Sequence, residues 1–214
     1  MIPAAPPIPS DAPFEADRAP PFVELVLHPE RFFRERDLAV KGLRLLLLLG
    51  VLGLASVLDR LEWNALSGKA AAATWAAYWG SALGMAILGG PLRWFVGGWW
   101  FRMRLLLSGA VDPDADQARR ISALSDLIWM VPTIVRALVV SFRYATPAAA
   151  AASSDGDATW LLVFLACWSI YVSYRGAAAS HPLERGKALV WFAILPALLL
   201  LAIMGLGFKL GTGR

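Results

Sequence analysis

The sequence predicts an all-α polytopic membrane protein with five transmembrane helices and a short N-terminal interfacial helix. Hydrophobic residues make up 58% of the chain and charged residues only 17%, whereas an average soluble domain has roughly 45–50% and about 25%. The charged residues gather between long apolar stretches. Several of these stretches approach the roughly 20 residues that a helix needs to cross a bilayer. These observations point to a helical bundle in a membrane.

Two segments precede the predicted spans. Residues 1–21 contain seven prolines and no apolar core, so we expect a disordered tail. Residues 22–37 include Pro29, which suits the first position of a helix, and several aromatic and aliphatic residues. We interpret 22–37 as an amphipathic helix at the cytoplasmic surface of the membrane. An ordinary turn leading into the first span is the alternative.

Residues 38–214 form the predicted five-helix transmembrane domain. Stretches with few or no charged residues locate its helices, and the first is long enough if Arg44 snorkels to the interface. The predicted spans cover residues 42–58, 70–92, 121–142, 158–174 and 188–208. The third span is the least apolar, because it contains Asp126 and Arg136.

Prolines predict two irregularities in these helices. We expect the second span to weaken at Gly89-Gly90-Pro91, since glycine and proline disfavour the helix interior. The aromatic and basic residues that follow, up to Arg104, then fit a short helix along the membrane surface. In the fifth span, Pro196 predicts a kink.

Basic residues near the predicted spans are divided unevenly between the two sides of the membrane. One side receives twelve, namely Arg31, Arg34, Arg36, Lys41, Arg44, Arg102, Arg104, Arg119, Arg120, Arg175, Arg185 and Lys187. The other side receives five, namely Arg60, Lys69, Arg143, Lys209 and Arg214. Because cytoplasmic loops are enriched in Lys and Arg, we predict a cytoplasmic N-terminus and an external C-terminus. The net charge of +4 follows from this bias, and no nucleic-acid partner is predicted, since that would need a basic stripe on a polar domain.

The second span carries a row of small residues. Ala72, Ala76, Gly80 and Gly84 recur every four residues, which places them on one face of a helix. Small residues allow the backbone of a neighbouring helix to approach closely in a membrane. We predict a helix-packing face at Ala76, Gly80 and Gly84. The alternative is that small residues are simply common in this chain.

Three charged residues in or beside the spans are candidate lipid or polar contacts, because intramembrane charges are rare and often functional. Asp126 and Arg136 lie about 15 Å apart along one helix, so each needs a partner on another helix or water. Asp126 and Arg93 fit solvated or anchoring positions at the interface. Arg136 can snorkel outward, line a polar cavity or grip a lipid phosphate with its bidentate donors.

Catalytic and cofactor motifs are not found in the sequence. It has no Gly-x-Ser-x-Gly, His-Glu-x-x-His or phosphate-binding glycine loop. The lone Cys167 and the separated His28 and His181 do not have metal-site spacing. We therefore expect no metal, no cofactor and no enzyme activity. A site scattered along the sequence is not excluded by motifs, since catalytic triads are defined by geometry.

Four short segments of the chain occur in a characteristic order. They are Leu27-His-Pro-Glu-Arg-Phe-Phe33, the glycine-rich end of the second span, Arg104-Leu-Leu-Leu-Ser-Gly109 followed by Ser122-Ala-Leu-Ser125 and Pro132, and Lys187-Ala-Leu with Leu195-Pro196. With the polar tail and five spans, they resemble the Yip1 domain family of small membrane proteins. The chain lacks the Asp-Leu-Tyr-Gly-Pro signature of eukaryotic members, so their vesicle-trafficking role is not implied. The Ala- and Arg-rich composition suits a bacterial member in the cytoplasmic (inner) membrane.

The resemblance and the lack of catalytic motifs imply a non-enzymatic protein for membrane organisation or interaction, or an adaptor. We expect it to contact membrane lipids and either a membrane protein partner or a second copy of itself. The alternative is a small transporter or channel component that moves a small solute or a lipid, since Pro91, Pro132 and Pro196 could break helices near charged residues. A lipid-modifying enzyme would need convergent polar groups that the sequence does not show.

Overall fold

The computed structural model describes residues 20–36, 38–66, 72–153 and 156–202, and these ranges contain helices and no strand. The elements are α1 (Pro21–Leu27), α2 (Pro29–Glu35), α3 (Gly42–Leu66), α4 (Trp75–Leu107), α5 (Ala115–Arg143), α6 (Pro147–Ala152), α7 (Gly156–Ser180), α8 (Arg185–Leu189) and the π-helical turn η2 (Val190–Ile194). The predicted all-α class is confirmed for this part of the chain. The tail predicted over 1–21 lies almost wholly outside the described residues, as does the end of the predicted fifth span.

Four helices are long and apolar enough to cross a membrane. They are Gly42–Asn64, Ala115–Arg143, Trp160–Ser180 and Arg185–Ala202. They overlap the predicted first, third, fourth and fifth spans, so the protein is a helical membrane protein. The predicted second span lies in α4 and is not among the four. Tryptophan and glycine are frequent in α4, which also contains Arg93, Arg102 and Arg104, and these residues lower its mean hydropathy.

Two helices extend beyond the predicted ends of their spans. Helix α3 continues to Leu66, so the predicted end at residue 58 is wrong, and the helix includes Asp59 and Glu62. Helix α4 runs through Pro91 as one helix of 33 residues, about 50 Å at 1.5 Å per residue. The expected weakening at this proline and the separate surface helix after it are therefore wrong. Close packing of the same stretch against α3, described below, holds the helix together there.

A kink was predicted at Pro196 in the last span, and the helix departs from regular α-helical geometry about one turn before this proline. The π-helical turn occupies Val190–Ile194, where the Leu195 N–H donates to the Val190 carbonyl. Pro196 follows directly and has no N–H with which to continue the regular ladder. Helix α6 was not predicted. It begins at Pro147, directly after Thr146, whose hydroxyl accepts a hydrogen bond from the Ala149 N–H at 3.2 Å, an N-cap interaction.

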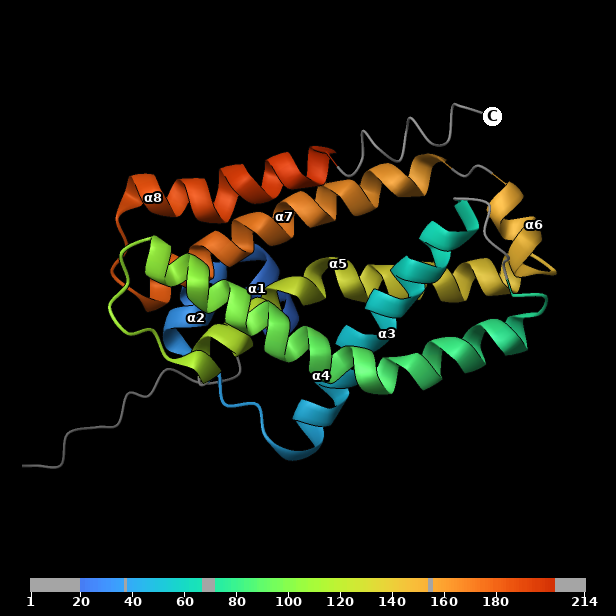
Figure 1. The fold of residues 1–214 in the computed structure, drawn as a ribbon, viewed down its shortest axis with the longest axis horizontal. Coiled ribbons are helices and arrows are strands. Elements are labelled where there is room, and N and C mark those ends of the chain that lie inside the picture. The colour runs from blue at the N-terminus through green and yellow to red at the C-terminus, as the bar shows by residue number, and fades with distance from the viewer. Residues whose placement is uncertain (1–19, 37, 67–71, 154–155, 203–214) are drawn as a thin grey trace, which may run out of the picture.

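The helices α4 and α5 are antiparallel, and hydrogen bonds mark both ends of the bundle. At one end, the Trp75 indole donates to the Tyr144 carbonyl at 2.7 Å, and the Trp79 indole donates to the Ser141 hydroxyl at 3.0 Å. At the other end, the Glu184 N–H donates to the Ser108 carbonyl at 3.0 Å. Figure 1 shows α5 and α7 running side by side, with the last helix, which begins at α8, along the other side of α7, while α3 crosses α5 obliquely.

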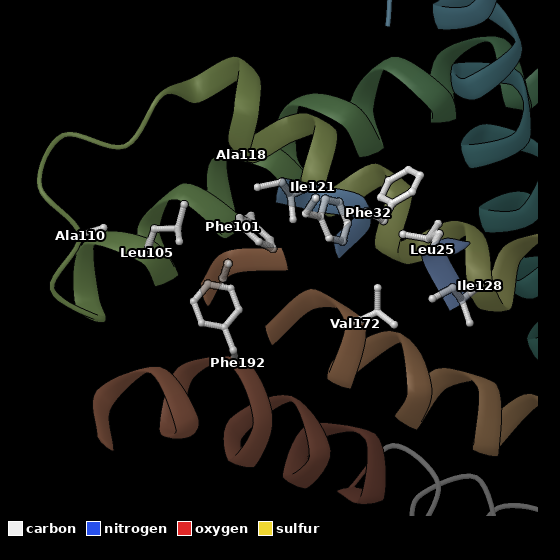
Figure 2. Close-up of a cluster of buried hydrophobic side chains, with 12 residues drawn as sticks. Leu25, Phe32, Phe101, Leu105, Ala110, Ala118, Ile121, Ile128, Val172 and Phe192 are labelled. Carbon is white, nitrogen blue, oxygen red and sulfur yellow. The ribbon is translucent and has the colours of Figure 1, made fainter. Parts of the chain in front are cut away.

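Helices α1 and α2 close one end of the bundle. A single helix over 22–37 was predicted, but the chain breaks at His28, because the residue before a proline is pushed out of the helical region. Phe32 and Phe33 are buried in a cluster with residues of α4, α5, α7 and η2, part of which Figure 2 shows. These aromatic side chains therefore pack into the protein and not into lipid.

Two contacts with α7 hold the closing segment in place. The Trp168 indole of α7 donates to the Val26 carbonyl of α1 at 3.0 Å. Gly176 of α7 leaves room for the Phe33 ring, since a Cβ at Gly176 would come within about 3 Å of it. Burying a phenylalanine side chain contributes roughly 1.5–3 kcal/mol. The segment is thus an integral part of the folded core.

Helices α3 and α4 approach each other at backbone distance. A Cβ on Gly53 would lie less than 3.0 Å from the Ala86 carbonyl oxygen, and a Cβ on Gly90 less than 3.0 Å from the Leu49 carbonyl oxygen. Ala82 and Ala86 are buried on the same face of α4. In lipid, helix association depends on van der Waals contact, which small residues maximise. This glycine contact therefore determines how α4 sits against the first span.

We expect Gly53→Ala and Gly90→Ala to destabilise the fold, because the added methyl group meets backbone that cannot rotate away. Overpacking costs roughly 1–3 kcal/mol. Thermal unfolding of the detergent-purified protein, followed by tryptophan fluorescence, measures the effect. Gly50→Ala is the matched control, since a Cβ there meets open space. Equal midpoints for Gly90→Ala and Gly50→Ala would contradict the close contact.

We also expect the N-cap of α5 to make stability depend on pH. The Asp114 carboxylate accepts hydrogen bonds from the Gln117 N–H at 2.9 Å and the Asp116 N–H at 3.3 Å, and these bonds hold its pKa below the usual value. A lowered folded-state pKa gives stability that is complete above the unfolded pKa of about 3.9 and is lost as pH falls through the folded pKa. Asp114→Ala should cost about 0.5–2 kcal/mol at neutral pH.

Asp114→Asn separates the cap from its charge. Asparagine caps as well as aspartate but does not titrate, so this variant should keep most of its stability at pH 7. It should also lose less stability than the wild type below about pH 4. Parallel acid-unfolding curves for the two proteins would show that the carboxylate contributes nothing.

Candidate functional site

A cluster of charged side chains lies between α3, α4 and α5, and we call it the interhelical charge cluster. It consists of Asp59 and Glu62 from α3, Arg93 from α4, and Asp126 and Arg136 from α5. Three of these residues were singled out from the sequence. Their positions inside long helices require partners, because lipid offers neither water nor counterions.

Arg93 and Asp126 form the first ion pair of the cluster. The Nε and Nη2 atoms of Arg93 both donate to Asp126 Oδ2, at 3.1 and 2.7 Å. The Asp126 side chain is 16% exposed and that of Arg93 is 42% exposed. The two candidates thus meet across α4 and α5, although they are 33 residues apart in sequence. The sequence indicated two separate contacts and did not predict this pairing.

Arg136 and Glu62 form the second ion pair. Arg136 Nη1 donates to Glu62 Oε2 at 3.1 Å, and Nη2 donates to Oε1. Two parallel bonds of this kind are the strong bidentate geometry of arginine with a carboxylate. Arg136 therefore finds its partner on another helix. Glu62 was missed, because the first span was predicted to end at the first acidic residue. Its place one turn after Asp59 in an apolar helix was the available signal.

Asp59 is the third carboxylate of the cluster. It interacts electrostatically with Arg93, and no hydrogen bond to it is found among the described residues. Three carboxylates and two guanidinium groups give the cluster a formal charge of −1. The arrangement holds α3, α4 and α5 together and presents one acidic group that could attract a cation or a proton.

The predicted small-residue face of α4 points away from the rest of the protein. Ala76, Gly80 and Gly84 are exposed. A Cβ on Gly80 or Gly84 would have no neighbouring atom within 4 Å in the described part of the chain. The face that packs internally is instead the one with Ala86 and Gly90. The predicted face is therefore free for another molecule, and its role in packing remains a prediction.

Arg104 is a buried cation that was not among the candidate site residues predicted from the sequence. It is 9% exposed, and its guanidinium carbon lies 5.1 Å from the Phe101 ring centre and 4.7 Å from that of Phe192. Its Nε has no hydrogen-bond partner among the described residues. Cation–π contacts of this kind stabilise a desolvated arginine by about 2 kcal/mol. Arg104 thereby links α4 to the π-helical turn.

Metal-binding groups of three or more His, Cys, Asp or Glu side chains are not found within the described ranges. Cys167 of α7 is exposed. Buried serines instead connect helices, as where the Ser169 hydroxyl donates to the Ser125 carbonyl at 2.8 Å. Most of the polar groups described so far bind one another and hold helices together.

Comparison with known families gives a match over most of the chain. The family model described as Yip1 domain matches residues 23–207, which is most of the chain and includes most of α1, all of α2 and all four candidate spans. No curated protein and no solved structure matches the chain.

We expect the bidentate ion pair to stabilise the bundle. Arg136→Ala leaves the Glu62 carboxylate without its partner, and removing one member of a fully buried pair costs roughly 3–5 kcal/mol. The loss should be smaller here, since the two side chains are 28% and 36% exposed. The double variant Glu62→Arg/Arg136→Glu should recover most of the stability, as measured by thermal unfolding in a double-mutant cycle.

Lys187→Ala is the matched control for this experiment. Lys187 pairs with Glu184 on the surface, where the side chains are 57% and 60% exposed, and exposed pairs contribute only about 0–1 kcal/mol. A charge-swapped protein as unstable as Arg136→Ala would mean that these side chains act through packing and not through their charges.

Proposed function

The chain belongs to the Yip1 domain family, and we propose that it is a non-enzymatic membrane protein that organises its partners by direct contact. It would bind a membrane protein partner, or a second copy of itself, along the exposed small-residue face of α4. The remaining membrane-facing surface would contact lipids. The observation that carries this proposal is the asymmetry of α4.

Two faces of α4 carry small residues at four-residue spacing. One face, with Ala86 and Gly90, already packs on the backbone of α3. The other face, with Ala76, Gly80 and Gly84, has the same spacing and no helix against it in the described part of the chain. Glycine costs helix stability of roughly 0.5–1 kcal/mol relative to alanine. Two exposed glycines one turn apart therefore suit close approach by a second helix.

The proposal includes α4 as a fifth span and a defined orientation. Helix α4 is antiparallel to the candidate span α5 and long enough to cross the membrane. Three segments carry the twelve basic residues of the predicted cytoplasmic side. The contact between α2 and α7 and the hydrogen bond between Ser108 and Glu184 bring these segments together at one end of the bundle. Since cytoplasmic segments are enriched in Lys and Arg, this end would face the cytoplasm, with α1 and α2 at the membrane surface. The membrane would be a bacterial inner membrane.

A transporter or channel component is the second candidate function. The interhelical charge cluster favours it, because acidic groups inside a membrane bundle are typical of ion and proton pathways. However, four of the five charges neutralise one another in pairs, and α4 continues through Pro91 instead of breaking. Broken helices are the feature that usually builds a transport site. The contact proposal therefore fits the geometry better.

Crosslinking in intact membranes, followed by mild extraction and mass spectrometry, tests the contact proposal. We expect a stoichiometric partner, or a dimer of the chain, that crosslinks to α4. The double variant Gly80→Leu/Gly84→Leu should reduce this crosslink severalfold, because large side chains keep the second helix at a distance.

Gly50→Leu is the matched control, since Gly50 is an exposed glycine of another span with open space around its Cβ. It should leave the crosslink unchanged. A monomer without partners in intact membranes would overturn the contact proposal. Liposome flux measurements with Asp59→Asn would then test the alternative.

A further inference from the structure

A hollow of about 460 Å³ lies where α7 ends and α8 begins. Its polar lining consists of Tyr174, Arg175, His181 and Arg185. The remainder of the lining is apolar, from alanine, proline and leucine side chains. In Figure 1 this connection lies at the end of the bundle that α1 and α2 close.

The lining of this hollow is basic and contains no carboxylate. Arg175 forms an ion pair with Glu30 of α2. The Glu30 side chain lines a neighbouring hollow and not this one. Arg185 has no ion-pair partner among the described residues, and the nearby Lys187 pairs with Glu184 at 2.9 Å. Guanidinium groups bind the oxygens of phosphate groups with parallel hydrogen bonds. The composition of the hollow therefore fits an anion.

One atom of the lining is buried without a partner. His181 Nδ1 has less than 1 Å² of accessible surface and no hydrogen bond within the described ranges. A buried polar atom without a hydrogen bond costs roughly 1–3 kcal/mol. A polar ligand that supplies the missing hydrogen bond removes this cost, which favours its binding. Because this nitrogen has less than 1 Å² of accessible surface, the imidazole ring must turn toward the hollow before a phosphate oxygen can accept a hydrogen bond from it.

The position of the hollow favours a ligand that belongs to the membrane. Arg185 is the first residue of the candidate span Arg185–Ala202. Leu189 and Val190, which follow it, are 48% and 46% exposed. A phosphate in the hollow would thus lie at the level where the apolar surface of the span begins. Lipid headgroups lie at this level, and acyl chains cover the exposed residues beyond it.

We propose that this hollow binds the phosphate group of an anionic phospholipid, with Arg185 and His181 as its hydrogen-bond donors. The site is separate from the exposed face of α4, so it does not depend on the proposed partner contact. It would fix the α7–α8 connection to one leaflet of the membrane.

Native mass spectrometry of the full chain in detergent, titrated with phosphatidylglycerol, tests this site. Arg185→Gln should weaken lipid binding about 10- to 100-fold, the effect of losing a charge-assisted hydrogen bond of roughly 1.5–3 kcal/mol. Lys187→Gln removes the same charge two residues away and outside the hollow. It should weaken binding by no more than about fivefold, through loss of general surface attraction. His181→Phe should also weaken binding beyond the Lys187→Gln control.

Inorganic phosphate and phosphatidylcholine distinguish the possible ligands. Weak binding of both, beside strong Arg185-dependent binding of phosphatidylglycerol, supports a site for an anionic lipid. Arg185-dependent binding of inorganic phosphate alone would overturn the lipid and show a site for free phosphate. Equal losses for Arg185→Gln and Lys187→Gln, or no binding of phosphatidylglycerol, would overturn the site itself.

Discussion

Charged groups inside a membrane bundle must find partners within the protein, and this constraint governs how α3, α4 and α5 fit together. Helix α5 carries an acid and a base about 15 Å apart, each paired with a different helix. Because Asp126 pairs with α4 and Arg136 pairs with α3, helices α3 and α4 are both restricted in their rotation about their axes and in their position along α5. The structure therefore uses ion pairs at the place where a soluble protein would rely on the hydrophobic effect.

Close packing adds the second constraint, because lipid chains are as apolar as the side chains they surround. Helices α3 and α4 gain contact by bringing backbone against backbone at Gly53 and Gly90. Aromatic residues fill the other end of the bundle, where Phe33, Phe101 and Phe192 belong to one cluster. The bundle thus has a glycine-packed region and an aromatic-packed region, and α4 contributes to both.

The sequence predicted the helical class, most of the spans and three of the five clustered charges, because long apolar stretches and isolated charges are local signals. It did not predict partners, since pairing depends on helix rotation. Glu62 was not predicted as a site residue, because the first acidic residue was taken as the end of the first span. Its ion-pair partner, Arg136, lies on α5. Small residues recur every four positions on two faces of α4, and spacing alone cannot tell which face packs internally.

The docking of α1 onto α7 sets an order of events during synthesis. The bond from Trp168 to Val26 joins residues 142 positions apart. At about 5–20 residues per second, ribosomes need roughly 7–28 s to make the intervening chain. During that time Phe32 and Phe33 have no α7 to cover them. Helices α1 and α2 therefore leave the ribosome well before α7, and they can reach their final place only after α7 has been made.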